Sequence, residues 1–155
     1  MGKDLQPGDK APDFEGTIQD GSTTRLSDFV GLRVAVYFYP KDNTPGCTKQ
    51  ACNLRDNYAK LLDAGIRIIG VSGDSEKSHD KFAARYDLPF PLIADTEKQI
   101  MQDYGVWVEK SMYGRKYMGT KRTTFLINED GTIRGVIEKP STGDHAAEVL
   151  TGFGD

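Results

Sequence analysis

Two apolar stretches on either side of a helix-length segment are the feature that most constrains the fold. Residues Arg33–Tyr39 (RVAVYFY) and Ile66–Val71 are rich in β-branched and aromatic side chains, which is typical of buried strands. Between them, residues 46–64 predict a helix that ends at Gly65. A strand, a helix and a second strand in this order indicate an α/β domain.

The rest of the chain continues this alternation. We expect a helix over Ser75–Tyr86 capped by Asp74 or Ser75, then a short strand at Leu92–Ala94 and a short helix over Thr96–Tyr104. Two strands, Thr123–Ile127 and Thr132–Glu138, should follow on either side of a turn at 128–131. A last helix is expected over Asp144–Leu150, with His145 exposed in its first turn. A small hairpin is expected near Thr17 and Thr24, and a loop or irregular edge strand over Glu109–Lys121. The prediction is one domain, residues 1–155, with a central mixed β-sheet flanked by helices and an N-terminal β-hairpin extension.

Size and charge exclude several classes of function. A chain of 155 residues can bury a core without disulfides or a structural metal. The net charge of -3 gives no reason to expect nucleic acid or an anionic membrane as a partner. No apolar run approaches the ~18 residues of a membrane span, and Met1–Asp20 lacks the pattern of a signal peptide. We therefore expect a cytoplasmic protein.

The segment from Pro40 to Cys52 carries the candidate chemistry. Thr44 is a good N-cap residue and Pro45 suits the first helical position, so Cys47 falls at the third. There its sulfur lies near unpaired backbone N–H groups and the positive end of the helix dipole. A thiolate is the nucleophilic form of cysteine, and the Thr44 hydroxyl is a further donor to the sulfur or to a bound oxygen.

The helix start is too weak to activate a thiol alone. A free cysteine, with a pKa of about 8.5, is only about 3% ionised at pH 7. A helix dipole contributes about 0.3–1 kcal/mol, whereas one pKa unit requires about 1.4 kcal/mol. A cationic partner is therefore expected. From the residues alone, Arg33, Arg55, Arg115 and Arg122 are all candidates.

The helical wheel separates the two cysteines. At 100° per residue, one apolar face contains Cys47, Ala51, Leu54, Tyr58, Leu61 and Leu62. Cys47 would then form the floor of a pocket at the solvent end of a buried stripe. Cys52 lies about 140° around the helix and about 7.5 Å along it, which is beyond the reach of a disulfide. A Cys47–Cys52 bond therefore requires residues 44–54 to unwind.

Other interpretations of the cysteine pair remain open at this point. Both thiols could be ordinary buried side chains without a reaction. A metal site is less favoured, because no second cysteine or histidine pair accompanies them and His79 and His145 lie in other elements. A disulfide reductase would typically contain Cys-x-x-Cys, whereas this spacing is Cys-x4-Cys.

The whole segment resembles the active-site pattern of peroxiredoxins, Pro-x3-Thr/Ser-x2-Cys, here Pro40, Thr44 and Cys47. The sequence Thr-Pro-Gly-Cys-Thr with Cys52 five residues on resembles the bacterioferritin comigratory protein (PrxQ) subgroup. The resemblance continues in order through Gly8–Phe14, Tyr37–Asp42, Leu54–Asp56, Gly70–Ser72, Leu88–Leu92, Tyr104–Trp107, Tyr113–Arg115 and Arg122–Ile127.

The resemblance implies a thioredoxin-like fold and an enzyme that reduces hydrogen peroxide and organic hydroperoxides without a metal or other cofactor. It assigns the peroxidatic role to Cys47 and the resolving role to Cys52, joined as a disulfide that thioredoxin reopens. It selects Arg122 as the cationic partner, Thr44 as the active-site hydroxyl and Pro40 as a shield of the pocket. It also implies a monomer.

Two alternatives keep the same fold. One is a thiol–disulfide oxidoreductase or redox-sensing module, which would lack fast peroxide chemistry. The other is a non-catalytic domain with inert thiols. Gln50 stands where many relatives carry Glu, a difference that we interpret as tuning of the site.

Overall fold

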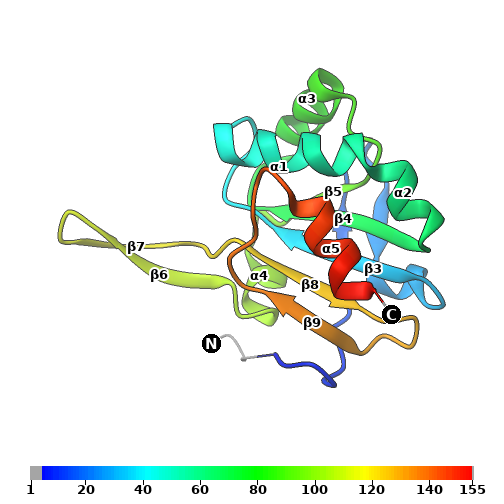
Figure 1. Ribbon diagram of the computed structural model, residues 1–155. Coiled ribbons are helices and arrows are strands. Elements are labelled where there is room, and N and C mark those ends of the chain that lie inside the picture. Colours follow the sequence, from blue (N-terminus) through cyan, green and yellow to red (C-terminus); the bar gives the residue numbers. More distant parts are fainter. Residues whose placement is uncertain (1–4, 155) are drawn as a thin grey trace.

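A five-stranded mixed sheet forms the centre of the computed structural model, which describes residues 5–154. The strands lie in the order β5-β4-β3-β8-β9 (Figure 1). β3 (Arg33–Phe38) pairs in parallel with β4 (Ile66–Ser72), and β4 pairs in parallel with β5 (Leu92–Ala94). β8 (Thr123–Ile127) and β9 (Ile133–Ile137) complete the sheet as antiparallel strands. The mixed sheet predicted from the sequence is confirmed.

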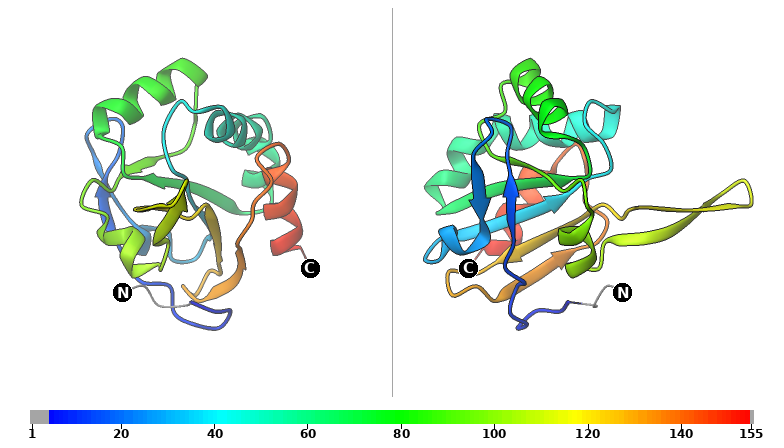
Figure 2. Two further views of the ribbon diagram at one scale, coloured as in Figure 1. Left: turned by 90° about the vertical axis from the view of Figure 1, so that its left-hand side faces the viewer. Right: turned by 180° about the vertical axis from the view of Figure 1, so that it is seen from behind.

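Helices cover both faces of this sheet. One face carries α1 (Pro45–Asp56), α2 (Tyr58–Asp63), α3 (Glu76–Tyr86) and α5 (His145–Phe153). The other face carries α4 (Gln99–Asp103), the 3-10 turn Leu26–Phe29 and the hairpin of β1 (Glu15–Thr17) and β2 (Thr23–Arg25). Figure 2 shows the helices α1 and α5 together on one side of the sheet. The predicted N-terminal hairpin is therefore confirmed, with Gly16 paired to Thr24.

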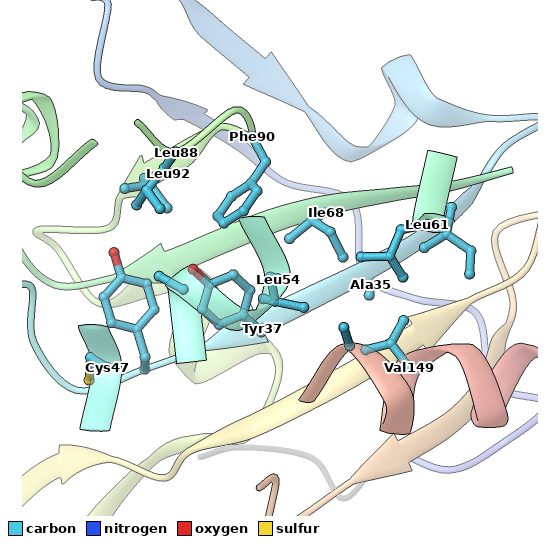
Figure 3. Close-up of a cluster of buried hydrophobic side chains, with 14 of the residues drawn as sticks. Ala35, Tyr37, Cys47, Leu54, Leu61, Ile68, Leu88, Phe90, Leu92 and Val149 are labelled. Atoms are coloured by element: carbon cyan, nitrogen blue, oxygen red, sulfur yellow. The ribbon is translucent and has the colours of Figure 1, made fainter. Parts of the chain in front are cut away.

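The alternation of side chains along β3 builds two hydrophobic cores. Ala35, Tyr37 and Tyr39 face the helices α1, α2, α3 and α5. Val34 and Phe38 face the opposite side, because successive side chains of a strand point to opposite faces. Figure 3 shows the helix-side core, with Cys47 at one end of it. The start of α1 thus lies at the edge of this core, and its packing there holds Cys47 in place.

The single helix expected over residues 46–64 is divided in two, so that expectation was wrong. α1 ends at Asp56 and α2 begins at Tyr58, with Asn57 between them at φ -110° and ψ 11°. The Asn57 side chain donates to the Asn53 carbonyl at 2.9 Å, competing with the backbone bond of the helix. Beyond the break, Leu61 is buried as expected for the predicted apolar face, whereas Leu62 is exposed instead of buried.

Residues 107–120 form a regular hairpin, and the expected loop or irregular edge strand was also wrong. β6 (Trp107–Met112) and β7 (Arg115–Thr120) pair in antiparallel register, with Met112 opposite Arg115. The two-residue turn has positive φ at both Tyr113 and Gly114. Such turns normally begin with Asn, Asp or Gly, so a tyrosine there concealed the signal in the sequence.

The remaining boundaries differ by a few residues. Ser75 is the N-cap of α3 and accepts from the Ser78 N–H, one of the two caps expected. α4 starts later than predicted, because the Asp95 carboxylate accepts from the N–H groups of Ile100 and Met101. α5 extends to Phe153, which packs in the core. Within residues 5–154, no helix has the length and apolar character needed to cross a membrane.

Candidate active site

Cys47 lies at the start of α1, where the chain leaves the central strand β3. Thr44 is the N-cap residue with extended backbone angles, Pro45 is the first helical residue and Cys47 is the third, as predicted. Burial of the thiol is almost complete, with 1% of the residue exposed. The sulfur therefore lies at the positive end of a helix and nearly out of contact with water.

Arg122 is the cation that reaches this thiol. It lies between β7 and β8, and its Nη2 donates to Cys47 Sγ at 3.2 Å. The other terminal nitrogen, Nη1, donates to Gln50 Oε1 at 2.7 Å. Gln50 is fully buried on α1, one turn beyond Cys47. One guanidinium thus binds two successive turns of the helix, and Gln50 holds it in place.

The other three arginines considered lie elsewhere. Arg33 faces Glu129 at 3.7 Å and lies over the Phe153 ring. Arg55 donates to the Tyr86 carbonyl at 2.7 Å, so it is partly buried rather than simply solvated. Arg115 is exposed on the β6–β7 hairpin. Of the four arginines considered, the structure thus places Arg122, the one that the family resemblance implied, against the thiol.

Thr44 and Pro40 occupy the loop before the helix. The Thr44 hydroxyl donates to the Lys41 carbonyl at 2.9 Å, and it makes no side-chain capping bond to the helix. Its oxygen therefore keeps acceptor capacity toward a ligand. Pro40 is exposed at the end of the strand. A side-chain carbon at Gly46 would lie 3.4 Å from Arg122 Nη2, an ordinary contact distance, so Gly46 borders the guanidinium.

Two buried polar atoms in this region have no hydrogen-bond partner among the described residues. They are Tyr37 Oη and Gln50 Nε2. Burial raises the pKa of Tyr37 well above its ordinary value, and the nearby Cys47 adds to the effect. The phenol therefore keeps its proton and remains a donor. Both groups are donors, and both are buried in the part of the molecule that contains Cys47.

A buried network anchors the loop from its other side, and sequence reasoning did not find it. Asp42 accepts from the Tyr39 hydroxyl at 2.6 Å and from the Ser78 hydroxyl at 2.8 Å. His79 Nδ1 lies 2.6 Å from the Asp42 carboxylate, and its Nε2 lies 2.9 Å from the Ile93 carbonyl. Both ring nitrogens of His79 thus face oxygen atoms of the protein, and the imidazole ties the loop to α3 and β5.

His145 is buried, so the expectation of an exposed side chain was wrong. Its Nε2 lies 2.8 Å from the Thr124 hydroxyl and its Nδ1 lies 2.9 Å from Glu148. The first turn of α5 packs on β8, which places His145 and Ala146 on the buried face. Burial lowers the pKa of His145, although the Glu148 carboxylate acts in the opposite direction.

Cys52 is half-buried on α1, and both cysteines are free thiols. The neighbouring Asn53 ties this part of the helix to the start of α5. Its Nδ2 donates to the Gly143 carbonyl at 3.1 Å, and its Oδ1 accepts from the Ala146 N–H at 2.8 Å. The second cysteine therefore sits beside a clamp, while the first turn of α1 has no comparable bond to α5 among the described residues.

The space around the loop is partly open. A cavity of about 510 Å³ lies beside Asp42 and Asn43, lined also by α3 residues, but Cys47 is not among its lining residues. The expected pocket floor is thus a buried position in this arrangement. Among residues 5–154, no group of three or more His, Cys, Asp or Glu is placed to hold a metal ion.

Known proteins share this architecture. The AhpC/TSA family model matches residues 7–136. A putative peroxiredoxin Bcp of Coxiella burnetii is 45% identical over 146 residues, covering 94% of this chain and 97% of the relative. Peroxiredoxin Bcp of Escherichia coli K12 is 46% identical over 94% of both chains.

Solved structures agree with these relatives. A PrxQ mutant of Xylella fastidiosa superposes with a TM-score of 0.90 at 31% identity, covering 96% of this chain and 95% of the other. Peroxiredoxin Q of Xanthomonas campestris gives a TM-score of 0.86 at 36% identity, over 90% and 89%. The predicted thioredoxin-like fold and the predicted resemblance are both confirmed. The chain belongs to the AhpC/TSA family, in which it groups with the peroxiredoxins named Bcp and PrxQ.

Proposed function

We propose that this chain, a thiol-dependent peroxidase, reduces hydroperoxides with Cys47 and forms a disulfide between Cys47 and Cys52 that a protein dithiol reopens. The observation that carries the proposal is the 3.2 Å contact between Arg122 and Cys47 Sγ at the start of α1. A guanidinium and a helix N-terminus both favour a thiolate, and the thiolate is the nucleophile. No cofactor is required for this chemistry.

In the first step, the Cys47 thiolate attacks the terminal oxygen of ROOH. The O–O bond breaks, RO⁻ leaves and takes up a proton, and Cys47 becomes a sulfenic acid. Because Thr44 already donates to the Lys41 carbonyl, its hydroxyl oxygen is free to accept the proton of the peroxide O–H. Arg122 and the backbone N–H groups of the helix start stabilise the charge that develops on the leaving oxygen. Pro40 shields the approach to the sulfur.

In the second step, the Cys52 thiol attacks the sulfenic sulfur and water leaves. In an intact helix the two Cα atoms lie about 8.6 Å apart, beyond the limit of about 7 Å for a disulfide. The first turns of α1 must therefore unwind, which releases Cys47 from the Arg122 contact. The Asn53 clamp to α5 favours unwinding that stops near Cys52 and leaves the rest of the helix in place.

In the third step, a dithiol of the thioredoxin type reduces the Cys47–Cys52 disulfide by exchange. This partner suits a cytoplasmic protein, since a reducing compartment keeps a close thiol pair reduced between turnovers. The solved Xanthomonas relative named bacterioferritin comigratory protein is described by its alkyl peroxide reduction activity. That description supports organic hydroperoxides as substrates besides hydrogen peroxide. We propose a single-domain monomer as the active form.

The test is a coupled assay with thioredoxin, thioredoxin reductase and NADPH, using hydrogen peroxide and cumene hydroperoxide. Cys47→Ser is expected to abolish peroxide consumption. Cys52→Ser is expected to keep the first oxidation, measured with stoichiometric peroxide and rapid quenching, and to lose thioredoxin-dependent turnover. If Cys47→Ser consumed peroxide at the wild-type rate, the assignment would be wrong. Slow oxidation of wild-type Cys47 together with fast disulfide exchange would favour a thiol–disulfide oxidoreductase instead.

A further inference from the structure

The β6–β7 hairpin extends away from the domain as an arm (Figure 1). Its two six-residue strands pair with each other, and no other described helix or strand contacts either of them extensively. A two-stranded hairpin without further packing is only marginally stable in water. Packing against the rest of the domain therefore does not explain why the arm is this long.

The turn at the tip of the arm has an unfavourable backbone conformation for a tyrosine. Tyr113 has a φ of +51° and Gly114 has a φ of +78°. A bulky residue is rarely found at positive φ, and Asn or Asp would suit this position better. The Tyr113 side chain is 99% exposed, so it gains nothing from packing within the molecule. Neither the backbone conformation nor packing within the molecule therefore explains a tyrosine in this turn.

The cross-strand register divides the arm into two unlike faces. One face, here named the docking face, consists of Lys110, Met112, Arg115 and Tyr117. The opposite face consists of Glu109, Ser111, Lys116 and Met118, and there Lys116 lies 4.0 Å from the Glu109 carboxylate.

The docking face has the composition of an interface. Met112 is 56% exposed and Tyr117 is 45% exposed. Tyr, Met and Arg are the types enriched at protein interfaces. Within the described part of the chain, no ion pair is formed by Lys110 or Arg115. Two cations and two large apolar groups are thus presented together, which suits a partner with carboxylates around an apolar patch.

The base of the arm lies close to the residue that contacts Cys47. β7 ends at Thr120, and only Lys121 separates it from Arg122, whose guanidinium contacts Cys47. Two residues of extended chain span at most about 7 Å. In Figure 1, the arm and the first turns of α1 both lie toward the left-hand side of the view. A protein that binds the docking face and extends along the arm to its base would therefore reach the Cys47–Cys52 disulfide.

We propose that the docking face, with Tyr113 at its tip, binds the protein dithiol that reduces the enzyme. This rests on the proposed function, which requires such a reductant. One thiolate of the reductant attacks a sulfur of the Cys47–Cys52 disulfide, forms a mixed disulfide and releases the other cysteine as a thiolate. The second thiol of the reductant then displaces the enzyme, so that the reductant leaves oxidised and both enzyme cysteines are reduced.

The test compares matched substitutions on the two faces of the arm. Tyr117→Thr and Arg115→Gln alter the docking face, whereas Met118→Thr and Lys116→Gln make comparable changes on the opposite face. Tyr113→Asn removes the tip contact while favouring the turn. Three quantities are measured for each variant: kcat/KM for thioredoxin in the coupled assay, the rate of oxidation by stoichiometric peroxide, and the rate of reduction by dithiothreitol.

The expected result is a loss specific to the protein reductant. Truncation of an aromatic anchor costs about tenfold in association, and loss of a rim charge costs less. kcat/KM for thioredoxin should therefore fall about tenfold in Tyr117→Thr, severalfold in Arg115→Gln and measurably in Tyr113→Asn. The opposite-face variants should keep the wild-type value. Oxidation by peroxide and reduction by dithiothreitol should be unchanged in all five proteins.

Other outcomes overturn the proposal. Unchanged kcat/KM in the docking-face variants, or equal losses on both faces, would remove the docking role. A change of mass in sedimentation without a kinetic effect would assign the face to a second copy of this chain. Failure of the proposed function is recognised separately, in the wild type: absent peroxide oxidation refutes the peroxidase chemistry, and reduction by dithiothreitol but not by thioredoxin refutes both the recycling partner and its docking site.

Discussion

Replacement of Arg122 by methionine tests whether its guanidinium activates Cys47. Nη2 donates to Sγ at 3.2 Å in a site where the sulfur is almost fully buried. A hydrogen bond to a charged group contributes about 1.5–3 kcal/mol. Since about 1.4 kcal/mol corresponds to a factor of ten in rate, Arg122→Met should slow the oxidation of Cys47 about 10- to 150-fold.

The same substitution has a structural cost that must be separated from the chemical one. Gln50 Oε1 loses the donor that now lies 2.7 Å away, and Gln50 is fully buried. An unpaired buried acceptor costs about 1–3 kcal/mol of unfolding free energy. Arg122→Lys keeps the charge but cannot serve Sγ and Gln50 together, so an intermediate rate is expected.

The assay mixes reduced protein with stoichiometric hydrogen peroxide, quenches with acid and quantifies Cys47 oxidation by mass spectrometry. Urea unfolding shows whether each variant is folded under the assay conditions. Arg55→Met is the matched control, because Arg55 is also a partly buried arginine but contacts the Tyr86 carbonyl and not the thiol. If folded Arg122→Met were oxidised within threefold of the wild-type rate, the activation argument would be refuted.

Three further predictions follow from the same geometry. Amide hydrogen exchange should accelerate over residues 44–54 in the oxidised protein, and identical exchange in both redox states would contradict unwinding. Asp42→Ala leaves His79 without its buried carboxylate and should cost about 3–5 kcal/mol in urea unfolding, while Asp80→Ala on the exposed side of α3 should cost little. Because burial lowers the pKa of His145, the unfolded state binds more protons than the folded state as the pH falls. The free energy of unfolding should therefore be largest above the unfolded pKa of about 6.5 and decrease below it. His145→Gln should remove this pH dependence.

Local rules were sufficient for the parts of this protein that depend on neighbours along the chain. The apolar run in β3, the Thr44–Pro45 helix start and the turn before β9 each follow from residues within a few positions of one another. The position of Cys47 at the third residue of α1 follows in the same way. These features could be predicted because backbone sterics, capping and side-chain periodicity act over one or two turns.

Local rules failed where a competing interaction or an unusual residue decided the outcome. The side chain of Asn57 bonds to the Asn53 carbonyl at the point where the long helix is interrupted. Tyr113 occupies a turn position at which Asn or Asp is usually found. His145 has a polar side chain at a helix start, which suggests exposure until β8 supplies Thr124 as its partner.

The active-site environment was decided by tertiary structure alone. Arg122 is 75 residues away from Cys47 in the chain, and Asp42 is 37 residues away from His79. The sequence by itself was enough to predict that Cys47 lies at the start of a helix and that an intact helix keeps Cys52 out of disulfide range. Residue types and spacing alone could not choose Arg122 among four arginines, and only the resemblance pointed to it. Its contact with Cys47, and the buried pair of Asp42 and His79, exist because the sheet brings distant segments together, and the strength of a charge interaction depends on separation and burial.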